Sequence, residues 1–427
     1  MPFFTNGMRQ TNLFTKTRKE VPADEQSKNA ELLIRGGFIH KEMAGVYSYL
    51  PLGLKVLKKI ENIIREEMDA IGGQEITMSA LQEKATWEPT DQWNDDNVDI
   101  WFKTKLKNET ELGLGWSHEG PVTKIIKQFA NSYRDFPVAP YQFQTKFRNE
   151  TRAKSGIMRT REFVMKDMYS FSKDQAQHDE FYTKATEAYK KIFKRVGIGH
   201  ITYMTSASGG VFSKFSHEFQ TITGAGEDTI YVDESKGIAI NKEVYTDDVI
   251  SSLGLDKNKL VERRAVEVGN IFTLGTKYTK AHNLVYKNEA GEEMEAIMGC
   301  YGIGPGRLMG TIVEVLSDDK GIIWGDEVAP FKVHLLMLGD KENVVKEAND
   351  LYKSLTKNNV EVLFDDRTDV SAGEKFADAD LLGMPYRVVV SERSLKDNGV
   401  EVKKRTEEKG QVMSATDFLN LLKAKSE

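Results

Sequence analysis

A basic stretch in the first half of the chain decides the fold: KFRNETRAKSGIMRTREFVMKD, residues 146–167. It holds seven Lys or Arg residues, although the whole chain has a formal net charge of −6. Residues 141–150 alternate apolar and polar side chains as a β-strand does. Residues 159–169 would form a second strand, and Ser155-Gly156 between the two suits a turn. The stretch therefore predicts a β-hairpin.

Each strand of this hairpin groups side chains that suit a nucleotide. Arg148 and Glu150 share a face of the first strand, and Arg159, Phe163 and Asp167 share a face of the second. Guanidinium groups suit phosphate oxygens, and a ring together with a guanidinium can enclose a purine. An exposed charged hairpin with Phe163 in the core explains the stretch equally well. The hairpin alone leaves both interpretations open.

A second stretch, EAIMGCYGIGPGRLMGTIVEVL at residues 295–316, predicts an apolar strand, a glycine cluster and a helix. It matches neither GxGxxG nor GxxxxGK[ST]. Arg307 would lie in the first turn of the helix, where the helix dipole disfavours a cation, and a bound anion would balance it. A glycine turn with a solvated Arg307 is the alternative.

A third stretch, LGWSHEG at residues 114–120, differs from a GxSxG nucleophile elbow because Glu119 stands where Gly is needed. Ser117, His118 and Glu119 are adjacent and cannot face one another as a catalytic triad. A buried Glu119 would suit a substrate ammonium group. A plain loop carboxylate is the alternative.

The composition is that of a globular protein with two or three domains: 427 residues, 40% hydrophobic and 29% charged. The single cysteine, Cys300, excludes internal disulfides and a multi-cysteine zinc site, and it fits a reducing compartment. There is no HExxH motif, no signal-like start and no run of 18 apolar residues. We therefore expect a cytoplasmic protein with no membrane partner.

Periodicity predicts helices over residues 51–73, 121–133 and 175–196, with a short strand in QEITMSAL at 74–81. Residues 228–265 are weakly patterned and receive no assignment. After residue 327, strands alternate with helices, which predicts a compact α/β domain. Its strands are expected in KVHLLML, VEVLFDD, YRVVVSE and GVEVKKR, and its helices near 341–357, near 371–382 and after Ser414.

Together these motifs resemble a known family. KFRNE followed by Arg159, Phe163 and Asp167 is similar to motif 2 of class II aminoacyl-tRNA synthetases, and GIGPGR is similar to motif 3. The segments GVYSYLPLG, LGWSHEG, QTKFRNE, MRTREFVMKDMYSF, SHEFQ, EVGNIFTLGTKY and MGCYGIG resemble the bacterial-type prolyl-tRNA synthetases, in the same order and almost end to end. This resemblance makes the two alternatives above, an exposed hairpin and a plain glycine turn, improbable.

The resemblance implies a fold and a domain division. We expect an α+β catalytic domain over 1–327, with a mainly antiparallel sheet flanked by helices, and an α/β anticodon-binding domain over 328–427. Motif 1 would span about 45–82, motif 2 about 143–169 and motif 3 about 297–316. The implied enzyme is a proline–tRNA ligase that forms a prolyl-adenylate from ATP and L-proline and passes the prolyl group to tRNA(Pro).

The resemblance also implies roles at an ATP site. Arg148 would hold the α-phosphate and the proline carboxylate, and Glu150 would contact the adenine amino group. Phe163 would stack on adenine, with Arg307 on its other face or on the γ-phosphate. Magnesium would accompany ATP with Glu267 nearby, and zinc is not implied. The implied ATP-binding residues are Arg148, Glu150, Arg159, Thr160, Phe163, Glu267, Gly304 and Arg307, of which Arg148, Arg159 and Arg307 would be catalytic.

For proline, the family's Thr-x-Glu loop corresponds to Ser117-His118-Glu119, and Glu119 would accept from the secondary ammonium. The remaining members of the implied proline pocket are Arg148, Met165, His217, Phe219, Gly299 and Cys300. The chain departs from the family at five places that bear on this pocket and on motif 1: Trp116 for Pro, Ser117 for Thr, Asn270 for His, Ser79 for Pro, and a longer GGVFSKFSHEF loop.

A larger departure concerns fidelity. Many bacterial relatives carry an editing domain between motifs 2 and 3, whereas only roughly 40 residues separate Glu227 from Glu267 here, too few for a domain. We therefore expect no editing within the chain. Alanine lacks two of the carbons of proline, which is worth about 1.6 kcal/mol of burial, or roughly 15-fold. Mischarged alanyl-tRNA would then be tolerated or cleared by a separate deacylase.

The C-terminal composition gives no support for RNA binding, with 16 Lys or Arg against 18 Asp or Glu over 331–427. Lys403, Lys404, Arg405 and Arg367 are the candidate anticodon contacts, and a solvated edge strand is the alternative. We expect a homodimer. Two other functions stay open: a non-catalytic paralogue that binds nucleotide or RNA, and a related class II synthetase of shifted amino-acid specificity.

Overall fold

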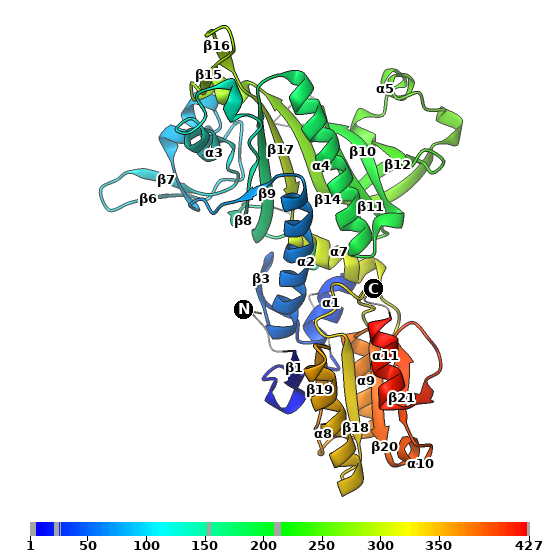
Figure 1. Ribbon diagram of the computed structural model, residues 1–427. Helices are drawn as coiled ribbons and strands as arrows, with labels where there is room; N and C mark the ends of the chain where they lie inside the picture. The colour runs from blue at the N-terminus through cyan, green and yellow to red at the C-terminus, as the bar shows by residue number, and fades with distance from the viewer. Residues whose placement is uncertain (1–5, 21–24, 26, 152–154, 209–214, 425–427) are drawn as a thin grey trace. The chain divides into compact units, whose positions relative to one another are not determined.

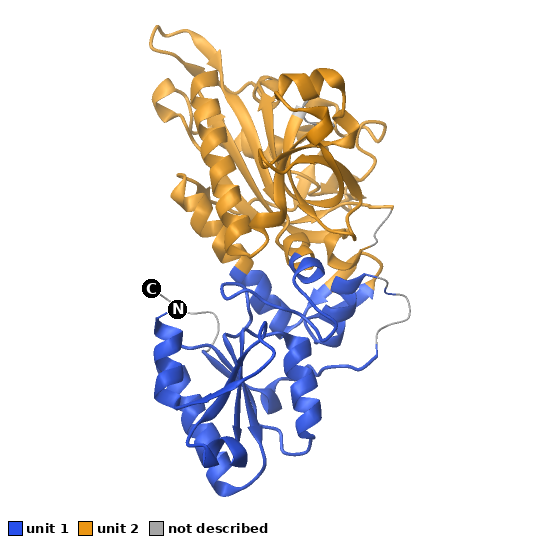
Figure 2. Cartoon of the chain, turned by 90° about the vertical axis from the view of Figure 1, so that its right-hand side faces the viewer, with its two compact units in different colours: residues 1–42, 48–59, 312–427 blue, residues 43–47, 60–311 orange. Residues whose placement is uncertain are grey.

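The structure is a computed structural model that describes residues 6–20, 25, 27–151, 155–208 and 215–424 (Figure 1). The chain divides into two compact units, one of residues 43–47 and 60–311, the other of residues 1–42, 48–59 and 312–427 (Figure 2). The unit that contains the C-terminal residues 312–427 therefore also includes two N-terminal segments, residues 1–42 and 48–59. A domain boundary near residue 327 stays a prediction.

The larger unit is built on a nine-stranded sheet in the order β11-β10-β13-β12-β14-β17-β9-β8-β4. Only β4 with β8 and β10 with β13 are parallel neighbours in this sheet, as far as the structure describes it, so the expected mainly antiparallel sheet is confirmed. Its strands are β4 (Gln74–Glu75), β8 (Pro140–Phe147), β9 (Glu162–Ser172), β10 (Thr202–Ser208), β11 (Phe215–Ile222), β12 (Asp228–Asp233), β13 (Ile238–Asn241), β14 (Val261–Gly275) and β17 (Ile297–Ile303).

Helix α4 lies along this sheet in Figure 1 and covers it with a stripe of buried side chains that includes Phe181, Ala185 and Tyr189. Its first turn is capped by Asp174, whose side chain accepts a hydrogen bond from the backbone of Gln177. The other helices that include residues of this unit are α2 (Pro51–Ala70), α3 (Glu119–Ile126), α5 (Asp247–Ser252), α6 (Lys277–Ala281) and α7 (Pro305–Val315), and α4 itself spans Gln175–Arg195.

The helices predicted over residues 51–73 and 175–196 are confirmed as α2 and α4. The helix predicted over 121–133 is wrong in its bounds, because α3 begins at Glu119 and ends at Ile126. The pattern included Phe129, but 73% of that side chain is exposed, so the buried stripe ends one turn earlier. The strand expected in QEITMSAL is reduced to the two residues of β4, and β5 begins at Leu81.

The predicted hairpin is confirmed: β8 pairs antiparallel with β9, with Lys146 opposite Phe163 and Gln142 opposite Asp167. Ser155 in the connection has φ +68°, a left-handed conformation that suits a tight turn. The polar face is the better buried one, because Gln142 and Lys146 are fully buried whereas Phe143 and Phe147 are only half-buried. The hairpin is therefore not an exposed charged surface.

Two small sheets complete this unit, and beside one of them a cluster of four tryptophans is buried. The ring of Trp101 lies 5.2–5.7 Å from those of Trp87, Trp93 and Trp116, which fixes the end of β7 against the core. The strands of these sheets are β5 (Leu81–Glu83), β6 (Lys103–Lys105) and β7 (Glu111–Leu114), and β15 (Val285–Lys287) with β16 (Glu293–Glu295).

The other unit contains the expected α/β domain, which is confirmed with nearly the predicted elements. Its six-stranded sheet has the order β1-β19-β18-β20-β21-β22, and β1 adds a parallel edge strand that the sequence did not predict. Helix α9 begins after Ser371, which caps it, and ends at Gly383 with φ +73°. Among the described residues, no helix is both long and apolar enough to span a bilayer.

The elements of this unit follow in chain order. The strands are β1 (Gly7–Arg9), β18 (Val333–Leu338), β19 (Val362–Asp365), β20 (Tyr386–Ser391), β21 (Val400–Lys404) and β22 (Gln411–Met413). The helices are α1 (Lys28–Arg35), α8 (Glu342–Lys357), α9 (Ala372–Leu382), α10 (Glu392–Lys396) and α11 (Ala415–Lys423). A separate two-stranded hairpin consists of β2 (Ile39–Met43) and β3 (Val46–Tyr49).

Candidate active site

The polar face of the β8–β9 hairpin lines a cavity together with β14 and the start of α7. A second cavity adjoins it and contains Arg159. A Cβ atom on Gly302 would lie 2.8 Å from Oδ1 of Asn270, so any larger residue at this position would collide with the Asn270 side chain in the cavity wall. The structure thus brings together all eight residues implied for ATP: seven in the first cavity (Arg148, Glu150, Thr160, Phe163, Glu267, Gly304 and Arg307) and Arg159 in the second.

Two of the three arginines are held by carboxylates. Nε of Arg159 lies 3.0 Å from Oε2 of Glu150, and its guanidinium also pairs with Glu227. Nη1 of Arg307 lies 3.2 Å from Oε2 of Glu267, and its Nε donates to a backbone carbonyl. These pairs hold the two guanidinium groups at the wall of the cavity.

Arg148 is different, because no ion pair in the described part of the chain includes it. Its Nε and Nη2 each donate to the carbonyl of Trp116 at 3.3 Å. Burial, reinforced by the charge of Arg307, lowers the pKa of Arg148. Its guanidinium carbon lies 5.4 Å from the ring centroid of Phe163. Within the described residues, the site therefore holds a half-buried cation without an ion-pair partner beside an aromatic platform.

Glu119 is the matching buried anion without a cation. Only 1% of the residue is exposed, and Sγ of Cys300 lies 3.6 Å from its Oε1. Its Oε2 is buried with no hydrogen-bond partner among the described residues. Burial raises the pKa of Glu119, and a hydrogen bond from Ser117 opposes that shift. A buried carboxylate oxygen with no partner is a site for a charged donor.

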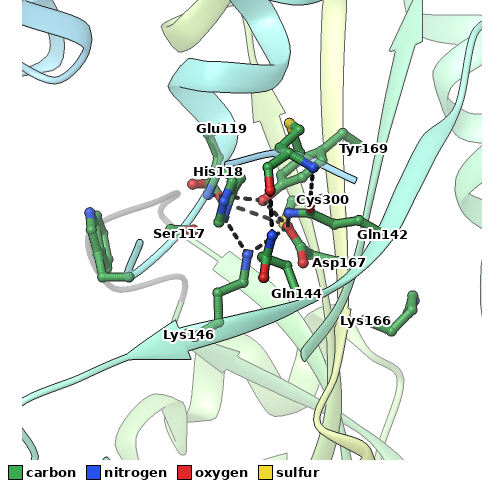
Figure 3. A network of polar contacts seen from close by, with 12 residues as sticks. Ser117, His118, Glu119, Gln142, Gln144, Lys146, Lys166, Asp167, Tyr169 and Cys300 are labelled. Carbon is green, nitrogen blue, oxygen red and sulfur yellow. Dashed lines mark hydrogen bonds and ion pairs between the residues drawn. The ribbon is translucent and has the colours of Figure 1, made fainter. Parts of the chain in front are cut away.

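A chain of hydrogen bonds lies beneath the loop that carries Glu119 (Figure 3). Nζ of Lys146 lies 2.9 Å from Oδ2 of Asp167 and donates to Nδ1 of His118. Oδ2 of Asp167 also accepts from Nε2 of Gln142 at 3.0 Å and from the hydroxyl of Tyr169 at 2.8 Å. This network connects the buried side chains of the floor of the site to one another.

Among the remaining residues implied for the proline pocket, Met165 lines the main cavity, and Ser117 and Cys300 adjoin Glu119. Nδ1 of His217 is hydrogen-bonded to the hydroxyl of Tyr182 at 2.7 Å, and His217 lines a different cavity. Gly299 pairs with Thr273 on β14, and Phe219 packs against the rings of Tyr189 and Phe193. The roles of His217, Phe219 and Gly299 at proline stay predictions.

Sequence reasoning missed several residues of the site. Glu227 and Asp228 line the Arg159 cavity, at the start of the weakly patterned segment 228–265. Lys146 and His118 were not assigned roles, and Asp167 was expected on the cavity face, yet it is buried under the loop. The signal for Lys146 was present: it alternates with Gln142 and Arg148 on the polar face of β8.

Two of the departures from the family have a structural account. Trp116 is anchored in the tryptophan cluster, with its ring 5.6 Å from that of Trp87, so its carbonyl is fixed where Arg148 donates to it. Nδ2 of Asn270 donates to Oε1 of Glu267 at 2.7 Å and orients that carboxylate. The longer loop falls largely on 209–214, outside the described residues.

The four candidate anticodon contacts lie in the α/β domain. Arg367 is paired with Asp365 and Asp378, and Arg405 is buried in a bidentate pair with Asp318. Lys403 and Lys404 are half-exposed on β21. A role for these four residues in RNA binding stays a prediction.

Comparisons with known families agree with this geometry. Residues 102–316 match the tRNA synthetase class II core domain (G, H, P, S and T), and residues 332–425 match an anticodon binding domain. A prolyl-tRNA synthetase structure from Giardia lamblia, in complex with prolyl-adenylate, has a TM-score of 0.75 over 92% of this chain and 78% of that chain, at 17% identity. The chain therefore has the class II synthetase fold, as expected.

Curated relatives narrow the family. A proline–tRNA ligase of Ehrlichia ruminantium is 37% identical over 97% of this chain and all of the relative, and one of Wolbachia pipientis wMel is 37% identical over 98% and 100%. A third, from Caldicellulosiruptor bescii, is 33% identical over 93% of this chain and 95% of the relative. The chain belongs to the proline–tRNA ligase family.

The lengths of these alignments differ. The alignment with the Ehrlichia ruminantium relative spans 430 positions, close to the 427 residues of this chain. The alignment with the Caldicellulosiruptor bescii relative spans 546 positions, so that relative contains segments with no counterpart here.

Proposed function

We propose that the chain activates L-proline with ATP to prolyl-adenylate and transfers the prolyl group to tRNA(Pro). One observation carries this proposal: Arg148 is a half-buried cation and Glu119 a buried anion, and neither has an ion-pair partner within the described residues. A free amino acid is a zwitterion. Its carboxylate fits Arg148 and its secondary ammonium fits Glu119, with Cys300 and Met165 as apolar walls.

The ATP side of the cavity supports adenylate formation. Attack of the proline carboxylate on the α-phosphorus needs alignment and neutralisation of the charge that develops on the phosphate oxygens. Arg148 adjoins the place where both reactants would meet, and Arg159 in the neighbouring cavity suits the γ-phosphate. Phe163 is the platform for adenine. No side chain acts as a nucleophile or a base in this proposal.

Magnesium is proposed to bind with the phosphates of ATP. Among the described residues, no group of three or more His, Cys, Asp or Glu side chains could hold a metal ion by itself. That fits Mg²⁺, which commonly takes one or two carboxylates together with substrate phosphates. Glu267 would be the nearest carboxylate, and burial together with the charge of Glu267 raises the pKa of neighbouring Glu218 to about 8. Bound magnesium would neutralise part of this negative charge.

We propose that the chain lacks editing, because the segment between motifs 2 and 3 is short and the alignment with the Ehrlichia ruminantium relative is of matching length. The pocket alone would then prefer proline over alanine by only roughly 15-fold from burial. Purified protein should leave alanyl-tRNA(Pro) intact over minutes. Rapid deacylation would contradict the absence of editing. Slow deacylation would mean that a separate enzyme must hydrolyse the mischarged alanyl-tRNA(Pro).

The remaining partners are also proposals. A cytoplasmic homodimer is expected from the family. Sedimentation equilibrium would measure the mass in solution. A monomer at micromolar concentration would contradict the homodimer.

The decisive experiment is amino-acid-dependent exchange of pyrophosphate into ATP with proline, alanine, threonine and cysteine. We expect the highest specificity constant with proline and a measurable leak toward alanine. A higher value with another amino acid would mean shifted specificity. Absence of exchange in folded protein that binds ATP would mean that the arginines frame a binding site and that the proposal is wrong.

A further inference from the structure

The buried network below Glu119 has an unusual charge balance. Asp167 and Glu119 are two buried carboxylates, and Lys146 is fully buried and adjacent to only one of them. Burial opposes the charge of Asp167, but Lys146, His118 and the hydrogen bonds from Gln142 outweigh it and lower its pKa. Lys146 therefore compensates Asp167 and leaves Glu119 as the carboxylate without a partner.

The protonation of His118 follows from the same network. Lys146 donates to Nδ1, so Nδ1 carries no proton and Nε2 donates to the carbonyl of Ser79 at 3.0 Å. The backbone N–H of His118 donates to the hydroxyl of Tyr169 at 3.2 Å. Burial, together with the charge of Lys146, lowers the pKa of His118 to about 4, so the ring is neutral at neutral pH. The residue before Glu119 is thereby held on both its ring and its backbone.

We propose that Lys146 and Asp167 are positioning residues that reserve the charge of Glu119 for the substrate ammonium and fix the Ser117–Glu119 loop through His118. This inference rests on the proposed function and deepens it. Lys146 does not touch the substrate; it acts by cancelling the charge of Asp167 and by supplying the proton donor to His118. With the pair in place, no ion pair in the described part of the chain includes Glu119, and an incoming secondary ammonium can take that position.

The chain offers a matched control in Lys166. It is also fully buried and is the neighbour of Asp167 in sequence, but its Nζ donates to the hydroxyl of Tyr189 at 2.7 Å and to the carbonyl of Tyr301 at 3.0 Å. It lies on the opposite face of β9, away from His118. Its replacement therefore perturbs a buried lysine that, among the described residues, has no ion pair with Asp167 and no hydrogen bond to His118.

The test measures proline-dependent pyrophosphate exchange, with separate KM values for proline and ATP. Asp167→Asn leaves Lys146 uncompensated, and its ammonium then competes for Glu119, so KM for proline should rise about tenfold or more while KM for ATP changes less than about twofold. A double variant, Lys146→Gln with Asp167→Asn, is neutral and keeps a donor for His118. It should return KM for proline to within about threefold of the unmodified chain. Lys166→Met should leave KM for proline unchanged.

Each possible result either supports the inference or overturns it. A double variant as impaired as Asp167→Asn, or an equal rise of both KM values, would reduce the pair to a structural role and overturn the inference. If Asp167→Asn does not fold, judged by loss of ATP binding, the double variant is compared with the unmodified chain, and a rise of KM for proline above about tenfold overturns it. The unmodified chain is measured before any variant. If it shows no proline-dependent exchange, the proposed function itself is wrong.

Discussion

The two compact units each contain a buried cluster of charges around a neutral histidine, and the clusters differ in one respect. In the α/β domain, Asp365 and Asp378 are matched by Arg367 and Lys375, two carboxylates against two cations. Nε2 of the histidine there, His334, contacts Oε1 of Gln10 at 3.0 Å. In the catalytic unit, Asp167 pairs with Lys146, and no ion pair in the described part of the chain includes Glu119. The first cluster is balanced, with an ion-pair partner for each carboxylate, whereas one carboxylate of the second cluster has none.

The difference separates a structural cluster from a binding site. Both carboxylates of the balanced cluster are satisfied on both oxygens, Asp365 by Arg367 and Asp378 by Arg367 and Thr17. In the other cluster, Oε2 of Glu119 and Oδ1 of Asp167 are buried without a hydrogen-bond partner in the described residues. Leaving a buried carboxylate oxygen unsatisfied costs stability, and at Glu119 the proposed substrate ammonium would offset that cost.

The largest effect is expected from removing the unbalanced charge. Glu119→Gln keeps the shape of the side chain but loses the ionic contact to the proline ammonium, which should raise KM for proline by about 100-fold. ATP binding should be unchanged because Glu119 lines neither ATP cavity. Exchange kinetics with varied proline measure this. An unchanged KM for proline would break the comparison, since the unpartnered carboxylate would then have no ligand.

The same change in the balanced cluster should act on stability alone. Asp365→Asn leaves Lys375 and Arg367 with one carboxylate between them, which should lower the free energy of unfolding of that domain by about 3 kcal/mol. The exchange reaction should keep its KM for proline. Urea unfolding followed by far-UV circular dichroism, alongside exchange kinetics, distinguishes the two effects. A selective rise in KM for proline would show that the clusters are not separable.

The two buried histidines, His118 and His334, should give the protein's stability the same dependence on pH. Burial lowers the pKa of His118 and of His334 to about 4, below the unfolded value of about 6.5. The unfolded state therefore binds protons first as pH falls, so stability is full above pH 6.5 and is lost between about 6.5 and 4, by about 3 kcal/mol for each ring. Urea midpoints measured from pH 7.5 to 4.5 test this. His334→Gln should flatten the slope for its domain, and an unaltered slope would contradict the assignment.

The smallest effect is expected on the surface of the α/β domain. Lys403→Ala combined with Lys404→Ala removes two half-exposed cations from β21. If they contact tRNA phosphates, KM for tRNA(Pro) should rise about threefold and its salt dependence should weaken, with pyrophosphate exchange unchanged. Aminoacylation at two salt concentrations measures both. Identical KM values and salt slopes would exclude these lysines from the interface.

Local patterns predicted much of this protein. The alternation over residues 141–150 and the turn at Ser155-Gly156 predicted the β8–β9 hairpin, because a strand's side chains alternate irrespective of the rest of the fold. The helix predicted near 371–382 is α9, which the structure caps at Ser371 and Gly383, both local signals. The α3 boundary failed at Phe129, since periodicity identifies an apolar stripe but not whether a partner surface covers it.

What the sequence by itself determined is therefore the set of groups and their spacing: the hairpin, the glycine strand before α7, the family, and eight residues that the structure brings together at two adjoining cavities. Only the tertiary structure decided which charges are paired. Lys146 and Lys166 stand on one hairpin with similar neighbours in sequence, yet one compensates a carboxylate and the other contacts neutral oxygens. Charge balance depends on distances across strands and on burial, and neither is encoded in local spacing.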